Sequence, residues 1–387
     1  MSVAGQGCLP AQESIKRKIN RVRNADSQAP TCPLTRAALR IPANYARYES
    51  EPGIFEPFLL GDSDRDRNWD SDADSAGEQG DNERILIFGR AEVKNWVHLV
   101  KKIYVDGTFS LAPELFSQIV VVLAERGGYA IPICYALLPD KSHRSYCRMI
   151  ELIEEAFRTL HPEAVSVDFK LALINAFKLL FPDATMHGCF FHLVRNMKKK
   201  LASLGLLKRY KNDPNFALFA RMIPALAFVR PDLLDNYMSE LLDALPEELR
   251  PLYEYFEEYY VGRITAVRPN GQLVRATPIF PPEVWSVYER TVNEEARTNN
   301  FVEAAHRRLQ AFYGVKHPTI WKFITGLRKF QHNRDAQMER YNSGRLPRPK
   351  SRRFLDTDRD LLNLVRTIDT RAPVIYLRGV AHNFLMD

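Results

Sequence analysis

The sequence predicts an α/β protein with a mixed-sheet core and an all-helical insertion before the last of three candidate acidic residues. Three observations support this prediction. Short β-branched and aromatic stretches alternate with amphipathic ones over residues 85–192. Strand signals then nearly vanish over residues 193–290, where helical patterns dominate. Finally, the carboxylates Asp106, Asp168 and Glu303 lie at or near the predicted ends of three separate elements.

Composition limits the possible classes of function. The chain has 387 residues, 45% of them hydrophobic, enough for two or three domains or one large one. A formal net charge of +7 is compatible with a nucleic-acid partner. Five scattered cysteines favour a reducing compartment over a disulfide framework. No secretory signal is expected, and the most apolar stretch, Ile119–Leu138, is broken by Glu125–Gly128, so it predicts two strands and no membrane span.

Residues 1–84 are expected to be largely irregular. Residues 61–83 are rich in acidic groups and poor in apolar ones, so they are predicted to form a disordered loop that cannot bury enough surface to order itself. Basic residues around Lys16–Lys18 fit a solvated helix face better than a phosphate contact.

The first part of the predicted core spans residues 85–192. A three-stranded meander followed by βα units implies a mixed sheet, in which the strands at 101–106 and 163–168 can lie parallel and adjacent. This is the RNase H-like arrangement, and it places Asp106 and Asp168 side by side. The expected strands are 85–88, 101–106, 116–124, 129–138, 163–168 and 184–187, and the expected helices are 91–99, 142–160 and 171–181.

The remainder of the chain is predicted to be mostly helical. Helices are expected at 191–204, 214–227, 231–244 and 246–260, followed by an irregular or hairpin segment at 262–282. The final core helices fall within residues 291–342, at about 300–312 and 319–342. Residues 343–387 are predicted to be a basic, proline-broken linker and a tail with a short helix and a strand, Pro373–Leu377.

Asp106, Asp168 and Glu303 are the candidate catalytic and metal-binding residues. Asp106 and Asp168 each follow a short apolar stretch, which holds a carboxylate rigidly at a strand end. Three carboxylates from separate elements can hold two Mg²⁺ or Mn²⁺ ions and support phosphoryl transfer by activating a water or a 3′-hydroxyl. An Asp-Gly pair such as Asp106-Gly107 is, taken alone, more often a plain turn.

Two alternatives concern the third acid. Asn300 and Glu303 have the spacing of a capping box, with Asn300 as the N-cap. Glu294 and Glu295 are rival third ligands.

Cys189 and His192 form a Cys-x-x-His pair after the strand predicted at 184–187, with His187 two residues before the cysteine. Zinc ligation is one interpretation. No second pair lies nearby in the sequence, so a packed cysteine and a hydrogen-bonded histidine are favoured and zinc is not expected. The role of the pair stays open.

Basic residues continue along the helix after His192 and recur later. Phosphate attraction and a solvated helix face are equally supported. The DNA-binding candidates are Arg195, Lys198, Lys199, Lys200, Lys208, Arg209, Arg307 and Arg308.

Seven short motifs lie between about residue 85 and about residue 340. They are Asp106-Gly-Thr-Phe, Pro113-x-x-Phe116-x-Gln118, Asp168-Phe, Gly188-Cys-Phe-Phe-His192, Leu226-Ala-Phe228, Trp285 and Arg297-Thr-Asn-Asn-x-x-Glu303. Taken together, these motifs resemble the transposases of Mutator-like elements (the MULE domain), in particular the animal lineage in which that domain often follows a FLYWCH-type zinc finger.

The resemblance implies a DDE transposase: a magnesium-binding triad of Asp106, Asp168 and Glu303 that cleaves and transfers DNA strands at transposon ends. It further implies double-stranded DNA, both transposon ends and target, as partner, a nuclear location, no membrane and a possible homo-oligomer. Two departures are notable. Lys170 stands where the family commonly has an acid, and residues 1–84 hold no zinc finger. A domesticated or truncated DNA-binding descendant without activity is therefore the alternative, and a zinc hydrolase is a weaker third.

Overall fold

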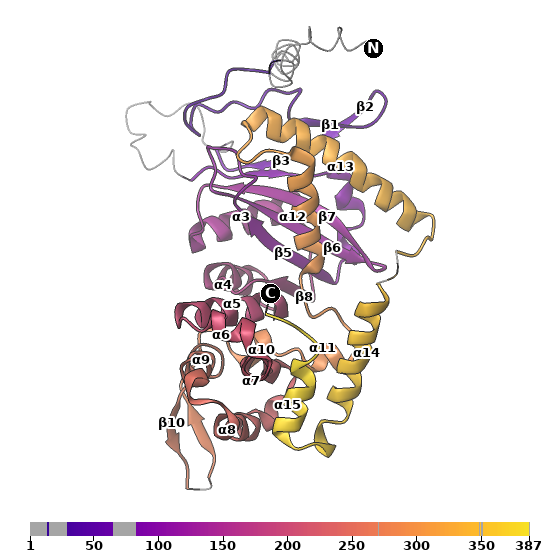
Figure 1. Cartoon of the computed structure of the whole chain (residues 1–387). Helices are drawn as coiled ribbons and strands as arrows, with labels where there is room; N and C mark the ends of the chain where they lie inside the picture. Colours follow the sequence, from indigo (N-terminus) through magenta and orange to yellow (C-terminus); the bar gives the residue numbers. More distant parts are fainter. Residues whose placement is uncertain are drawn as a thin grey trace, which may run out of the picture.

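A mixed sheet carries both aspartates singled out in the sequence (Figure 1). The computed structural model describes residue 14 and residues 29–64, 83–269, 271–347, 349 and 351–386. Within these ranges, seven strands form one sheet in the order β3-β4-β7-β6-β5-β8-β9. Their bounds are Leu59–Asp62 (β3), Leu86–Phe88 (β4), Lys102–Thr108 (β5), Gln118–Arg126 (β6), Tyr129–Leu138 (β7), Ala164–Val167 (β8) and Thr185–Gly188 (β9). The predicted α/β class with a large mixed sheet is confirmed.

The pairing of β5 with β8 sets the position of the two acids. β5, β6 and β7 form the predicted antiparallel meander, with its tight turn at Gly127-Gly128. β8 pairs parallel to β5, with Tyr104 opposite Ser166. Asp106 lies two residues after Tyr104, and Asp168 lies two residues after Ser166. They therefore leave the sheet at the same edge, as the sequence predicted.

Both faces of the sheet are buried, which explains its long apolar strands. Along β6, Val120 and Val122 face one core while Val121 and Leu123 face the other. The first core is covered by α3 (His143–Ala156) and α4 (Leu171–Leu180). The second is covered by α12 (Asn300–Tyr313) and α13 (Ile320–Asn342), which cross the sheet in Figure 1.

A helical region interrupts the sequence between β9 and α12. Its buried side chains join the core on the α3 face. Pro214 starts α7, and the Asp213 carboxylate accepts hydrogen bonds from the amides of Asn215 and Phe216, a standard N-cap. The elements are α5 (Phe190–Ser203), α6 (Leu207–Asn212), α7 (Pro214–Ala225), α8 (Leu234–Ala244), α9 (Arg250–Phe256), the hairpin β10 (Ile264–Val267) and β11 (Leu273–Arg275), α10 (Pro282–Trp285) and α11 (Tyr288–Val292).

The N-terminal region differs from the prediction. Residues 36–60 are not irregular throughout, because β1 (Arg47–Glu51) and β2 (Ile54–Pro57) form a hairpin and β3 joins the main sheet. Tyr48 and Phe58 from this region are buried in the core beneath α13, which anchors the segment to the main sheet. Most of the predicted acidic loop and all of Lys16–Lys18 lie outside the described residues.

Two further expectations are wrong. Residues 91–99 form two short 3₁₀ turns, Ala91–Asn95 and Val97–Leu99, instead of one α-helix. The predicted strand Pro373–Leu377 is the start of helix α15 (Pro373–Ala381), which follows α14 (Arg352–Arg366). Tyr376, Leu377 and Val380 are fully buried at helical spacing against the insertion helices. No helix in the described part of the chain has both the length and the apolar character that a membrane crossing requires.

The assignment of α15 as a helix can be tested with two neighbouring positions. We expect Leu377→Ala to lower the free energy of unfolding by about 2–5 kcal/mol, because its side chain is fully buried. Ile375 is 62% exposed, so the control Ile375→Ala should change stability by less than about 0.5 kcal/mol. Urea unfolding measures both. A strand would put both side chains on one face, so equal losses would contradict the helix.

Candidate metal centre

The two aspartates converge with a histidine in a buried cluster. Asp106 and Asp168 are only 6% and 7% exposed at the ends of β5 and β8. One carboxylate oxygen of each and one ring nitrogen of His192 lie within 4.8 Å of one another. Asp106 Oδ1 also accepts a hydrogen bond from the Gly107 amide at 2.8 Å. Three side chains from three elements thus point their donor atoms at one volume.

His192 reaches the cluster from the first turn of α5. Its Nδ1 is buried without a hydrogen-bond partner among the described residues, so the hydrogen-bonded histidine expected from the sequence is not found at this nitrogen. Burial lowers the pKa of His192, which favours the neutral imidazole that a metal ion needs.

Cys189, by contrast, is a packed thiol. It is fully buried, burial raises its pKa to about 12, and its sulfur accepts a hydrogen bond from the Asn299 amide at 3.1 Å. Its sulfur is also not among the donor atoms that converge in the cluster. The structure thus agrees with the prediction of a packed cysteine. The zinc-hydrolase alternative had relied on Cys189 as its sulfur ligand, and the structure gives that role no support.

Glu303 approaches the same cluster from α12. Its Oε1 lies 4.0 Å from His192 Nε2, just outside the tight group formed by the other three side chains. Burial, followed by the charge of Asp106, raises the pKa of the Glu303 carboxyl. The structure therefore brings Asp106, Asp168 and Glu303 together around His192.

The alternatives for the third acid fit less well. The N-cap of α12 is Asn299, and its side chain makes no capping hydrogen bond, so the Asn300 capping box is wrong. Glu295 pairs at 3.6 Å with Lys102, at the opposite end of β5 from Asp106. Glu294 faces Arg366 at 3.9 Å.

Asn299 holds the elements of this cluster together. Its side-chain amide donates to the Ser166 carbonyl at 3.3 Å, and its Oδ1 accepts from the Ser166 hydroxyl. Its backbone amide donates to Cys189, and it is completely buried. These contacts tie the start of α12 to β8 and to the start of α5, so Glu303, Asp168 and His192 cannot move independently.

Lys170 is the cation of the site. Its ammonium lies 2.9 Å from Asp168 Oδ2, while Asp168 Oδ1 is buried without a partner among the described residues. Burial and then the neighbouring Asp168 raise the pKa of Asp106, an effect that His192 and Lys170 partly offset. Lys170 thus neutralises part of a charge that two buried carboxylates would otherwise leave uncompensated.

His306 is a site residue that sequence reasoning missed. Its Nδ1 lies 3.6 Å from Asp106 Oδ2, and its Nε2 is buried and unpartnered within the described ranges. Burial lowers its pKa to about 4, so the ring is neutral near pH 7. The signal was Glu303-x-x-His306, which puts both side chains on one face of a helix, one turn apart.

The residues present fit a divalent cation. Asp168 Oδ1, His192 Nδ1 and His306 Nε2 are buried with no partner in the described structure. Carboxylate oxygens and neutral imidazole nitrogens are the donors that divalent cations take from proteins. Lys170 competes for the second oxygen of Asp168.

The basic candidates fall into three groups. Arg195 and Arg307 are exposed and near enough to Glu303 for their charges to oppose the rise in its pKa. Arg209 pairs with Glu248, so its charge is already balanced, and Arg308 lines a cavity elsewhere. Lys198, Lys199, Lys200 and Lys208 continue along α5 and α6, away from the acids.

The fold and this cluster define a class of protein: a mixed α/β protein with buried aspartates at adjacent parallel strand ends. Residues 102–196, from β5 into α5, match the family model of the MULE transposase domain. This segment is therefore similar to a MULE transposase domain, the family that the motifs resemble, and it contains Asp106, Asp168 and the Cys189-x-x-His192 pair. Glu303 lies beyond it. No curated protein matches the chain.

A pair of adjacent asparagines tests the anchoring of α12. We expect Asn299→Ala to lower the free energy of unfolding by about 1–3 kcal/mol, because it leaves the hydroxyl and carbonyl of Ser166 unpaired in the interior. Asn300 is exposed, so Asn300→Ala should have almost no effect in the same chemical denaturation assay. The opposite result, a loss of about 1 kcal/mol at Asn300 alone, would restore the capping box.

Proposed function

We propose that this chain is a DDE-type transposase that cleaves and transfers DNA strands with the help of a divalent cation, on an RNase H-like sheet. The observation that carries the proposal is the convergence of Asp106, Asp168, His192 and Glu303 at one sheet edge, within and just beyond a MULE transposase domain. The antiparallel β5–β6–β7 meander and the parallel β8 and β9 support the RNase H-like assignment.

Asp106, Asp168 and His192 would hold Mg²⁺ or Mn²⁺, with Glu303 close enough to join them. When bound, such a cation neutralises charge on the phosphoryl group and helps to deprotonate the attacking hydroxyl or water. The described structure gathers the tight donor group for one ion. A second ion, with Glu303 as the third carboxylate, stays a prediction from the sequence.

The chain's own residues supply orientation and proton transfer. His306 is neutral and lies beside Asp106, with its Nδ1 3.6 Å from Asp106 Oδ2, so its ring limits the space open to that carboxylate. The raised pKa of Glu303 makes this half-buried carboxylate a better proton acceptor than an ordinary surface glutamate. Arg195 and Arg307 are exposed cations close to Glu303, and they suit the phosphate backbone of double-stranded DNA.

The main alternative is a DNA-binding descendant of a transposase that no longer cuts. The ion pair between Lys170 and Asp168 favours it, because a fixed ammonium reduces the attraction of the site for a metal cation. A nuclear location, a homo-oligomer and the FLYWCH-associated lineage are further proposals that rest on the resemblance alone.

Cleavage of labelled duplex DNA in Mg²⁺ or Mn²⁺ tests the proposed activity. We expect the wild type to nick or cut and Asp106→Asn to be slower by about a hundredfold or more, because the variant removes one charged ligand. EDTA should abolish the wild-type activity. Equal cleavage by both proteins would contradict the site. If neither cuts and both bind DNA in a salt-dependent way, the non-catalytic alternative holds.

Direct metal binding tests the role of Lys170. We expect Lys170→Ala to bind Mn²⁺ roughly tenfold more tightly than the wild type, because an ammonium 2.9 Å from Asp168 no longer repels the ion. Lys141→Ala is the control, since Lys141 lies over the Phe109 ring and pairs with no carboxylate of the site. Electron paramagnetic resonance of free Mn²⁺ gives both affinities. Unchanged binding by Lys170→Ala would show that its charge does not oppose the metal.

A further inference from the structure

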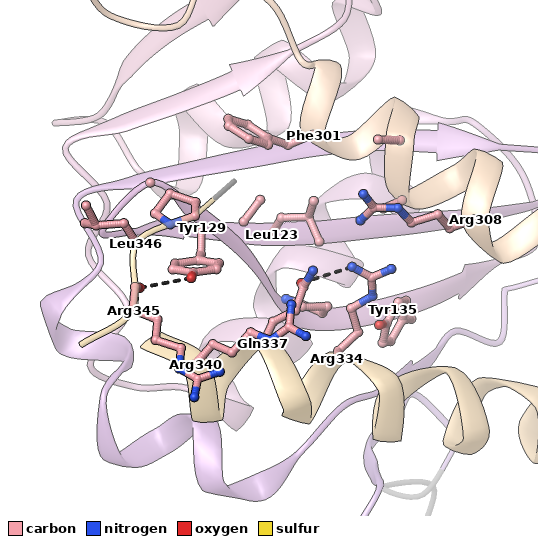
Figure 2. A pocket seen from close by; sticks show the side chains of 16 residues that line it. Leu123, Tyr129, Tyr135, Phe301, Arg308, Arg334, Gln337, Arg340, Arg345 and Leu346 are labelled. Carbon is pink, nitrogen blue, oxygen red and sulfur yellow. Dashed lines mark hydrogen bonds between the residues drawn. The ribbon is translucent and has the colours of Figure 1, made fainter. Parts of the chain in front are cut away.

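A cavity lies behind α12, and neither aspartate lines it. It has a volume of about 530 Å³ and is enclosed by α12, α13, the β6–β7 hairpin and residues 345–347 (Figure 2). Phe301, Ala305 and Arg308 line it from α12. Glu303 is two residues from both Phe301 and Ala305, about 200° round the helix, and so faces the other way. One helix therefore separates two sites.

The cavity concentrates positive charge. Arg308, Arg334, Arg340 and Arg345 all line it, and no carboxylate does so within the described residues. None of the four forms an ion pair with any part of the chain that the structure describes. Arg308, Arg340 and Arg345 are exposed and can be hydrated, so the buried Arg334 is the one whose charge is costly in the absence of an anion.

Arg334 gives the strongest indication of a missing partner. It is only 8% exposed, and its Nε is buried with no hydrogen-bond partner among the described residues. Its Nη1 donates to the neutral Gln337 amide at 3.0 Å, and burial and then the charge of Arg308 lower its pKa. Figure 2 shows Arg308 and Arg334 reaching into the same space from α12 and α13. A buried guanidinium normally satisfies its donors, so these groups point to an anionic ligand.

Aromatic side chains form part of the remaining wall, beside aliphatic residues and prolines. Tyr129 and Tyr135 come from β7, and Phe301 faces the cavity from α12 with 36% of its surface exposed. Phe301 packs edge-on against Tyr104, which fixes the orientation of its ring. An inorganic anion alone would leave this apolar surface in water, whereas a planar aromatic group would cover it.

We propose that this cavity binds a nucleotide, with its phosphate on the arginines of α12 and α13 and its base against the aromatic wall. The volume suits one nucleotide and is too small for a duplex. The nucleotide is either a free mononucleotide or an unpaired nucleotide of a DNA strand. Only the second source rests on the proposed function, since the cavity shares no side chain with the metal centre.

Fluorescence anisotropy with the full chain tests the inference. The probes are a fluorescein-labelled single-stranded DNA and, as competitors, dAMP and inorganic phosphate, all in EDTA. We expect Arg308→Gln to weaken binding of the strand at least about tenfold. The control Lys322→Gln removes one positive charge from an exposed position on α13 that does not line the cavity, and it should change binding by less than about twofold.

A second variant tests the aromatic wall. Phe301→Leu should weaken dAMP about fivefold or more and leave inorganic phosphate unaffected. Displacement of the strand by dAMP identifies a pocket that also takes free nucleotides, and Arg308 dependence of the strand alone identifies a strand nucleotide. Equal losses for Arg308→Gln and Lys322→Gln, or equal competition by phosphate and dAMP, would overturn the inference. The assay measures no cleavage, so its outcome is independent of the metal-dependent activity.

Discussion

The geometry of the metal centre depends on the buried hydrogen bonds of Asn299. This side chain spans Ser166 on β8, and its amide reaches Cys189 at the start of α5. Each of these anchors lies a few positions before a site residue. Ser166 is two residues before Asp168, and Cys189 is three residues before His192. Asn299 itself is four residues before Glu303. Because the anchors are buried and mutually satisfied, three distant segments of the chain behave as one rigid support.

The metal centre contains its own cation, which is unusual for a site that attracts metal ions. Two buried carboxylates repel each other, and Lys170 relieves this repulsion within the chain itself. Such compensation stabilises the site in the absence of an ion and weakens its pull on one. The neutral His306 adds a dipole beside Asp106 without adding charge. The same residues therefore set both the stability of the empty cluster and its metal affinity.

Local patterns predicted the sheet well because its strands are long apolar runs and its turn is marked by glycines. They predicted the Asp106–Asp168 pairing because a meander followed by βα units leaves few arrangements. Strands β1 to β3 were missed and helix α15 was predicted as a strand, since the short apolar runs around Phe58 and at Tyr376–Leu377 acquire meaning only from distant packing. The contact of His306 with Asp106, and the gathering of Arg308 with Arg334, join residues far apart in sequence. No local pattern encodes such contacts.

The covering of the sheet by α12 and α13 has a consequence for the order of folding. The segment that matches the transposase domain ends at residue 196, yet one face of its strands is covered by helices that begin near residue 300. During synthesis the sheet must wait, with Val121 and Leu123 uncovered, until the whole insertion and α13 have emerged. Contacts of such long sequence separation slow folding and expose an apolar surface to aggregation. A fragment trimmed to the matched residues would keep that surface bare permanently.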